Sequence, residues 1–315
     1  MINTDILYSL LLCNTHKEVI NYIEKHINTN NFIKLKTDVY SIYIPKNLET
    51  SVPACVAHTD VVQQVKSKKH LSRKKHILYN NQKNCGLGAD DRVGCYILLR
   101  TMISNPNDFI FCFFDLEESG GFGSRNFGGE MIKDYVSLWV GFDRCGDYDI
   151  ATYSNDNESL LKAIDDNLFD GYTQIMGSFT DVATLAENTG IACINFSVGF
   201  IKEHTNNETL NLKTLSNIFS VIPILKTMTT PYKVDVESYS YGKDYYFGRA
   251  FYGERDYYND MSYYGEDDIE KEDSDYEWDK YYVCNTCGEE FFEIEVVDSR
   301  KCPHCGNDNL TACYY

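Results

Sequence analysis

The hydrophobic positions of residues 1–229 follow two spacings, one typical of helices and one typical of strands. Residues 34–45 alternate apolar and polar side chains, which predicts a strand. A spacing of three or four residues predicts helices over four segments: 91–104, 158–168, 181–189 and 212–228. The same spacing occurs near the N-terminus, at Ile6, Leu10 and Leu11 and again at Val19, Ile20, Ile23 and Ile27.

Four further segments are nearly continuous apolar runs: VPACVA (52–57), FIFCFFDL (109–116), VSLWVGF (136–142) and IACINFSV (191–198). Such runs are typical of strands that helices cover on both faces. Because these strands alternate with predicted helices, residues 1–229 are expected to form an α/β domain. The predicted architecture is a three-layer α/β/α sandwich with a mostly parallel mixed sheet.

The composition changes after residue 229 and divides the chain into three parts. Residues 230–280 contain 11 of the 25 tyrosines, and 15 Asp and Glu against 6 Lys and Arg, without a sustained period. We expect an acidic, Tyr-rich linker there, because few aliphatic residues are present to form a core. The alternative is that its tyrosines dock on a neighbouring surface. Residues 281–315 form the third part.

The composition also limits the protein's location and partners. The net charge of −18 disfavours nucleic acid as the main partner. No segment approaches the roughly 20 apolar residues of a membrane span, and the N-terminus lacks the basic lead of a signal peptide. Four of the 12 cysteines lie in apolar runs, which is typical of reduced thiols: Cys55, Cys95, Cys112 and Cys193. We therefore expect a cytoplasmic protein.

Histidine and acidic residues follow the predicted buried strands. His58 comes directly after the first run, the pair Glu117–Glu118 after the second, and Asp143 after the third. His204 lies a few residues beyond the fourth. Asp90 lies in a Gly-rich turn that leads into a helix. Since open α/β sheets place their sites at the carboxyl ends of strands, these residues are expected to meet.

Carboxylates that converge in one crevice need a cation. Asp90, Glu117, Glu118 and Asp143 would repel one another, and some would have to stay protonated. Two divalent ions would balance the four charges. Imidazole and carboxylate ligands suit zinc, and they also admit manganese or cobalt.

Taken singly, each residue has a plainer interpretation. His58 could be a hydrogen-bonded core histidine, and the pair Asp90–Asp91 could be a helix N-cap. Glu117 and Glu118 could be a solvated strand end. Asp143 and His204 could be ordinary turn and loop residues, so the case for a metal site depends on the joint pattern.

Five blocks of sequence resemble, in order, the motifs of the co-catalytic zinc exopeptidases: AHTD (57–60), GADDRVG (88–94), DLEESGGFGS (115–124), GFD (141–143) and HTNNE (204–208). That family includes bacterial leucyl aminopeptidases, tripeptidase T and amino-acid deacylases. The resemblance covers about residues 1–229, and GADDRVG together with the EE pair is its specific part. The stretch GSFTDVATLAENTGIACINF also resembles the corresponding region of these enzymes.

The resemblance implies a ligand set for two metal ions. His58 and Asp143 would bind one ion, Glu118 and His204 would bind the other, and Asp90 would bridge both. The ions would most simply be zinc.

The resemblance also implies catalytic roles for two acidic residues. Asp60 would orient the His58 imidazole and fix its tautomer. Glu117 would be the general base that accepts a proton from the water between the ions and passes it to the leaving amine.

The spacing of the motifs bears on the substrate. Only 60 residues separate Asp143 from His204, too few for the lid domain of the deacylases and tripeptidase T. This favours an aminopeptidase or dipeptidase that acts beside a free N-terminus, with an N-acyl amino-acid deacylase as the alternative. GADDRVG and the long gap after His58 look more like tripeptidase T. The family also suggests a homo-oligomer.

The gap between His58 and Asp90 contains a basic run, KSKKHLSRKKH (66–76). The plainer expectation is a solvated loop. The run could instead recognise an acidic substrate or the acidic linker.

Two C-x-x-C pairs near the C-terminus, Cys284 with Cys287 and Cys302 with Cys305, are separated by 14 residues. Four thiolates at this spacing predict a zinc ribbon with one structural zinc ion. A redox pair or two disulfides are the alternatives. Since residues 281–315 carry 6 acidic and 2 basic residues, a structural or protein-binding ribbon is favoured over one that binds nucleic acid. A non-catalytic adaptor with such a ribbon is the alternative to an enzyme.

Overall fold

The computed structural model describes residues 2–153, 157–166 and 168–234, and the backbone of three strands between residues 280 and 314. The chain divides into two compact units, Met1–Glu254 and Arg255–Tyr315. No helix among the described residues is both long and apolar enough to cross a membrane.

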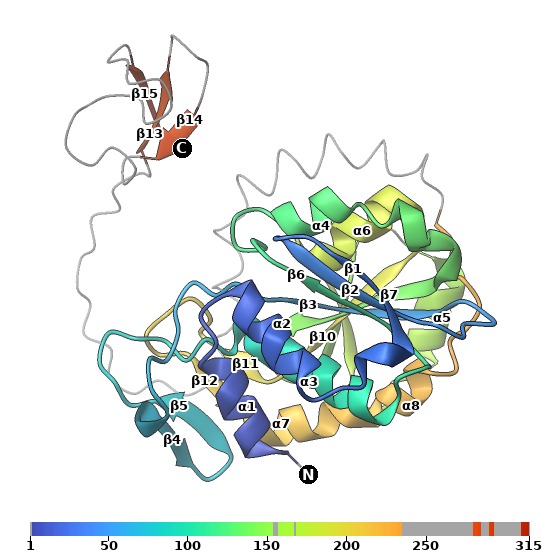
Figure 1. Cartoon of the computed structure of the whole chain (residues 1–315), viewed down its shortest axis with the longest axis horizontal. Helices are drawn as coiled ribbons and strands as arrows, with labels where there is room; N and C mark the ends of the chain where they lie inside the picture. The colour runs from blue at the N-terminus through green and yellow to red at the C-terminus, as the bar shows by residue number, and fades with distance from the viewer. Residues whose placement is uncertain are drawn as a thin grey trace. The chain divides into compact units, whose positions relative to one another are not determined.

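The first unit is built on an eight-stranded sheet in the order β1-β2-β6-β3-β7-β10-β8-β9 (Figure 1). Four adjacent strands, β6, β3, β7 and β10, are parallel. The two strands before β6 and the pairing of β8 with β10 are antiparallel, so the sheet is mixed. The strand bounds are β1 Phe32–Lys36, β2 Tyr40–Pro45, β3 Val52–His58, β6 Ile110–Phe114, β7 Val136–Arg144, β8 Asp149–Thr152, β9 Thr173–Met176 and β10 Cys193–Ser197.

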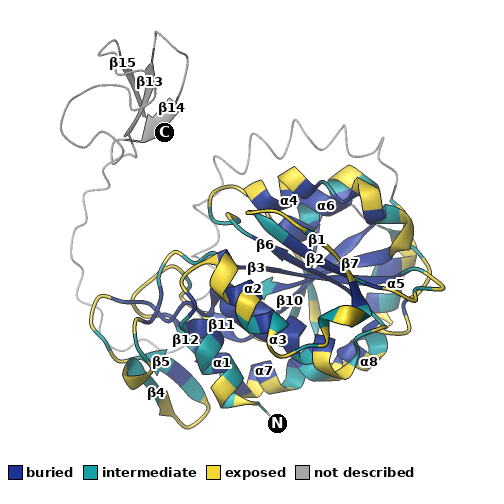
Figure 2. Cartoon of the chain, viewed as in Figure 1, coloured by how far each residue is buried: buried dark blue, intermediate teal, exposed yellow. Residues whose placement is uncertain are grey.

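The four parallel strands are the four apolar runs of the sequence. Every residue of β3, β6 and β10 is buried, as are the first seven residues of β7. Helices cover the sheet on both faces, which is why these strands can be apolar on both sides (Figure 2). The predicted fold class, a three-layer α/β sandwich with a mostly parallel mixed sheet, is confirmed.

The helices form two layers. Helices α1, α2, α3, α5, α7 and α8 pack in one core cluster on one face, and α4 and α6 pack in another on the opposite face (Figure 1). The helix bounds are α1 Thr4–Leu11, α2 His16–Glu24, α3 Ala89–Ser104, α4 Phe122–Phe127, α5 Glu158–Asp165, α6 Asp181–Thr189, α7 Leu212–Asn217 and α8 Ile222–Leu225. The described residues also contain short 3-10 turns between these elements: η1 Thr29–Asn31, η2 Lys68–His70, η3 Glu130–Tyr135 and η4 Ile218–Ser220.

Two predicted elements are each divided in the structure. Residues 34–45 form the hairpin of β1 and β2, because Thr37 turns the chain and its hydroxyl accepts hydrogen bonds from Val39 N and Tyr40 N. The single helix predicted over residues 212–228 is α7, η4 and α8. Pro223 has no N–H to continue the helical ladder, and it lies in the first turn of α8.

A second, four-stranded sheet in the order β11-β12-β5-β4 lies beside the main one. It pairs the hairpin β4 (Leu71–Lys74) and β5 (Ile77–Asn80) with β12 (Thr209–Asn211), and β12 pairs with β11 (Phe200–Ile201). The basic run 66–76 therefore contains the 3-10 turn η2, strand β4 and the turn that leads to β5, and the prediction of a loop is wrong. Its lysines are exposed, as expected.

The predicted linker begins on the first unit. Lys233 forms a bridge with Ile191, and Tyr232 N donates to Ser137 O. The rest of the predicted linker, residues 235–279, lies outside the described residues.

In the second unit, β13 (Lys280–Cys284) pairs antiparallel with β14 (Glu290–Phe292) and with β15 (Leu310–Tyr314). Cys284 ends β13, but no side chain of this unit is described. Cys287, Cys302 and Cys305 lie outside the described residues, so the zinc ribbon stays a prediction.

Candidate functional site

The candidate ligands meet at the carboxyl edge of the parallel strands. Val56 of β3 pairs with Gly141 of β7, so His58 and Asp143, each two residues further on, leave the sheet at the same level. His58 also pairs with Phe114, the last residue of β6, and the Glu117–Glu118 pair follows that strand. The topology therefore brings together residues that are up to 85 positions apart in the chain.

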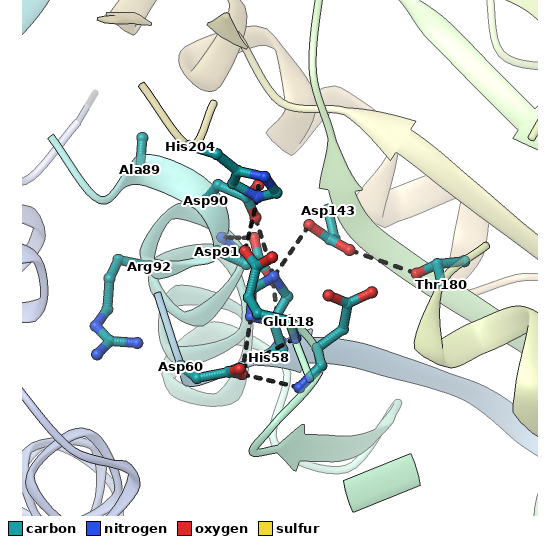
Figure 3. Close-up of polar contacts among 12 residues, drawn as sticks. His58, Asp60, Ala89, Asp90, Asp91, Arg92, Glu118, Asp143, Thr180 and His204 are labelled. Atoms are coloured by element: carbon teal, nitrogen blue, oxygen red, sulfur yellow. Dashed lines mark hydrogen bonds and ion pairs between the residues drawn. The ribbon is translucent and has the colours of Figure 1, made fainter. Parts of the chain in front are cut away.

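One cluster forms around His58, which is almost completely buried. Its Nε2 lies 2.9 Å from Oδ1 of Asp90 and 3.5 Å from Oδ1 of Asp143 (Figure 3). Ligand atoms of these three residues lie within 4.8 Å of one another. The backbone of Asp143 is held by Asn195, whose side chain accepts from Asp143 N at 2.9 Å and donates to Asp143 O at 3.3 Å.

A second cluster forms around His204, which is 46% exposed. Its Nε2 lies 2.8 Å from Oε1 of Glu118 and 3.1 Å from Oδ2 of Asp90. Asp90 thus turns one carboxylate oxygen to each cluster. The structure brings together all five predicted ligands, in two groups that share Asp90 (Figure 3).

Asp60 connects the first cluster to the acidic pair. One of its oxygens lies 3.3 Å from Nδ1 of His58, on the side of the ring away from Asp90. Its carboxylate also accepts hydrogen bonds from Glu117 N and Glu118 N, both at 3.1 Å. Burial opposes ionisation of Asp60, but the contacts with His58 and these amides lower its pKa overall. Asp60 can therefore orient the imidazole and hold the backbone of both glutamates.

The site carries more buried negative charge than its histidines balance. Burial, together with the charges of Asp143, Asp181 and Glu118, raises the pKa of Glu117 to about 9. Burial and the charge of Asp90 raise the pKa of Asp143 to about 7. Divalent cations would remove this conflict, because they favour the ionised carboxylates.

The histidines respond to the same charges. Contacts with Asp90 and Glu118 raise the pKa of His204 to about 10. Two convergent groups of oxygen and imidazole nitrogen atoms, without a thiol, are a donor set that suits two divalent ions sharing one carboxylate. The residues present therefore fit the predicted metals.

Asp91, which the sequence offers only as part of a helix N-cap, also contacts the backbone of His58. The peptide bond between Asp90 and Asp91 is cis. Asp91 Oδ1 accepts from Gly94 N at 2.8 Å, which caps α3, and Oδ2 accepts from His58 N at 3.1 Å. A side chain on Gly94 would collide with this carboxylate. The plainer interpretation of an N-cap thus holds for Asp91, while Asp90 faces the cluster.

Asn195 and Glu208 were not predicted from the sequence, and both are buried. The sequence contained a signal for each. Asn195 is a polar residue inside an apolar strand, and Glu208 ends the block HTNNE without an assigned role. A buried polar side chain needs hydrogen-bonding partners, so such positions point to a structural task near the site.

No protein-family model matches the sequence, and the search of curated proteins found no match. Solved structures do match the fold. The aminopeptidase PepT from Bacillus cereus has a TM-score of 0.58 and 12% identity, over 71% of this chain and 97% of that one. A tripeptidase from Staphylococcus aureus has a TM-score of 0.57 and 13% identity, over 72% and 97%.

A third similar structure is the TET1 peptidase from Pyrococcus horikoshii. It has a TM-score of 0.52 and 13% identity, over 71% of this chain and 98% of that one. At these identities the likeness shows a shared fold. The first unit of this chain therefore has a fold that is also found in peptidases.

Proposed function

We propose that residues 1–229 form a two-metal hydrolase that cleaves the peptide bond next to a free N-terminus, as an aminopeptidase or dipeptidase does. The observation that carries the proposal is the pair of ligand clusters that share Asp90, with Glu117 beside them. The peptidase folds of the similar structures support it.

In this proposal His58 and Asp143 would hold a first ion, Glu118 and His204 would hold a second ion, and Asp90 would be a ligand of both. Zinc is the ion we expect first, and manganese or cobalt would suit the same ligands. When bound, the two ions would polarise the substrate carbonyl and lower the pKa of a bound water molecule.

Glu117 would be the residue that moves the proton. Its side chain is half-buried and shares a group of ligand atoms with His58 and Glu118, all within 4.8 Å. It would accept a proton as water attacks the carbonyl, and then donate that proton to the leaving amine. Asp60 would hold the Glu117 backbone and the His58 ring in position during this transfer.

Two features favour a substrate with a free amine. The described residues between Asp143 and His204, namely 144–153, 157–166 and 168–203, belong to the main sheet, its covering helices and β11, and none of them forms a separate lid. A free α-amine of the substrate could also coordinate one of the bound ions. An N-acyl amino acid lacks that group, so a deacylase is the weaker alternative.

We further propose that the four cysteines of the second unit, Cys284, Cys287, Cys302 and Cys305, bind one structural zinc ion. A cytoplasmic location would suit the first unit, whose seven cysteines form no disulfide. The TET1 peptidase of Pyrococcus horikoshii assembles into a tetrahedron or an octahedral shell. A homo-oligomer is thus a proposal for this chain, and sedimentation of the purified protein would test it.

Hydrolysis by the purified full chain tests the function. With zinc, manganese or cobalt supplied, it should cleave members of a panel of free-amine peptides, and should cleave acylated amino acids more slowly. A chelator should abolish cleavage, and the substitution Glu117→Gln should slow it by about 10²–10⁴-fold. Cleavage by Glu117→Gln at the wild-type rate would contradict the mechanism, and inactivity of the wild type across the panel would favour a non-catalytic adaptor.

A further inference from the structure

The buried carboxylate of Glu208 accepts hydrogen bonds from four successive backbone amides. Its Oε2 accepts from Leu87 N at 3.1 Å and Gly88 N at 2.6 Å. Its Oε1 accepts from Ala89 N at 2.8 Å and Asp90 N at 3.0 Å. The side chain is 3% exposed, so water has little access to these bonds.

The amides belong to the turn that presents Asp90. Gly88 has a φ of +74°, a left-handed conformation that glycine adopts without strain. A side chain at this position would also lie 2.9 Å from Gln63 O. Successive amides that converge in such a turn form an anion-binding concavity, and Glu208 fills it from within the protein.

Glu208 also lies four residues after His204, on the same connection between β11 and β12. A second bridge joins the same two segments, because Gln63 donates to His204 O at 3.1 Å and accepts from Gly86 N at 3.0 Å. The turn that carries Asp90 and the connection that carries His204 are therefore tied together at two points.

We propose that Glu208 is a positioning residue that sets the distance between Asp90 and His204, and so shapes the half of the site that binds the second ion. This inference rests on the proposed two-metal site. His58 and Asp143 are placed by adjacent strands of the sheet, whereas His204 lies on an exposed connection with a left-handed backbone, φ +60°. Apart from the contacts of the His204 imidazole itself with Asp90 and Glu118, the described hydrogen bonds between the two segments are those of Glu208 and Gln63.

A purely structural role would give a different result. If Glu208 only capped α3, its loss would lower the stability of the fold and leave the relative affinities of the two ions unchanged. If it positions the ligands, the second ion must lose affinity more than the first. Partners that orient metal ligands typically contribute 10–100-fold to affinity.

The variant Glu208→Gln keeps the shape of the side chain but replaces one acceptor oxygen with an NH₂ group that faces backbone N–H donors. Zinc and cobalt affinities of the full chain would be measured by competition with a chelator. We expect the second ion to bind about 10–100-fold more weakly and the first to change less than about threefold. The control is Glu49→Gln, which removes an exposed carboxylate from the turn between β2 and β3, at the opposite edge of the sheet.

Hydrogen exchange of the metal-free protein gives a readout that needs no ion. The amides of residues 87–90 should exchange at least about tenfold faster in Glu208→Gln than in the wild type, since they lose a charged acceptor. Glu208→Asp keeps the charge, is one methylene shorter, and should give the same changes to a smaller extent. This variant also serves if Glu208→Gln does not fold.

Two results would show that Glu208 is only a structural cap. One is an equal loss of affinity for both ions, and the other is unchanged metal affinity in a variant whose amides at residues 87–90 exchange faster. An unchanged exchange rate of these amides would show that Glu208 does not hold the turn that carries Asp90. A wild type that binds two ions but cleaves no peptide would refute the proposed function while leaving this comparison intact. A wild type that binds no ion would refute both the two-metal site and the positioning role.

Discussion

The two halves of the candidate metal site are built in different ways. His58 and Asp143 come from adjacent parallel strands, and their side chains are 1% and 14% exposed. His204 comes from a connection outside the main sheet and is 46% exposed. Asp90 belongs to both halves.

The difference concerns what holds each ligand in place. The half that contains His58 and Asp143, here the sheet-built half, is held by strand pairing and by buried side chains such as Asn195 and Asp91. The half that contains His204 and Glu118, here the loop-built half, depends on a few long-range hydrogen bonds. They are those of Glu208, Gln63 and Asp60. We therefore expect the first half to keep its geometry without metal and the second to depend more on its supporting contacts.

The largest effect should come from removing the residue that both halves share. Asp90→Asn keeps the size of the side chain but cannot supply two anionic oxygens. Both ions should be lost, and peptide hydrolysis should fall by at least about 10⁴-fold. Metal analysis after dialysis would check this, with Glu49→Gln as the control. A variant that keeps both ions would show that Asp90 is not a bridge.

The next effect should separate chemistry from metal binding. Glu117→Gln removes the proposed base but none of the five proposed ligands. We expect hydrolysis to fall by about 10²–10⁴-fold while both ions stay bound. Steady-state kinetics and metal content measured on one preparation would check this. Loss of an ion in this variant would mean that Glu117 is a ligand instead.

The halves should respond differently to the loss of their histidines. In His204→Ala the second ion should bind at least about tenfold more weakly while the first keeps its affinity. In His58→Ala the first ion should be lost, and its absence should also disturb Asp90. The exposed His26 provides a matched control, His26→Ala. If His204→Ala lowered the affinity for the first ion as much as for the second, the two halves would not bind metal independently.

A further effect acts on stability instead of metal binding, and it concerns His16, which contacts the residue after His58. His16 is buried between Thr59 and Ser41, and burial lowers its pKa to about 4. The folded protein holds this ring neutral, whereas the unfolded chain takes up a proton below about pH 6.5. The stability is therefore complete above pH 6.5 and is lost as the pH falls towards 4, by up to about 3 kcal/mol.

Chemical unfolding at several pH values would test this, with His16→Gln as the comparison, because glutamine can keep hydrogen bonds but does not titrate. The wild type should lose about 3 kcal/mol more than the variant between pH 6.5 and pH 4. Equal losses in both proteins would show that His16 does not carry this pH dependence.

Much of the fold was predictable because its signal is local. Continuous apolar runs marked β3, β6, β7 and β10, and polar residues directly after them marked one edge of the sheet. Asp90 gave a weaker signal, since its turn precedes a helix and is equally typical of a cap, and its bridging role came from the resemblance to the zinc exopeptidases.

The rest depends on contacts that the sequence does not display. The bonds of Glu208 to residues 87–90 span about 120 positions, and no spacing rule connects them. The hairpin of β4 and β5 was hidden by its basic residues, which favour solvent whether they lie on a loop or on a strand. Its place is set by pairing with β12, a partner that is distant in the chain.

Native mass spectrometry of the full chain, loaded with zinc and then dialysed, tests the two-metal site most directly. We expect three zinc ions per wild-type chain, with two lost in Asp90→Asn and the third retained. Cys302→Ser should lose only that third ion, which the predicted ribbon would hold. A wild-type chain with a single zinc ion, or an Asp90→Asn chain that retains all the zinc of the wild type, would contradict a dimetal centre at the edge of the sheet.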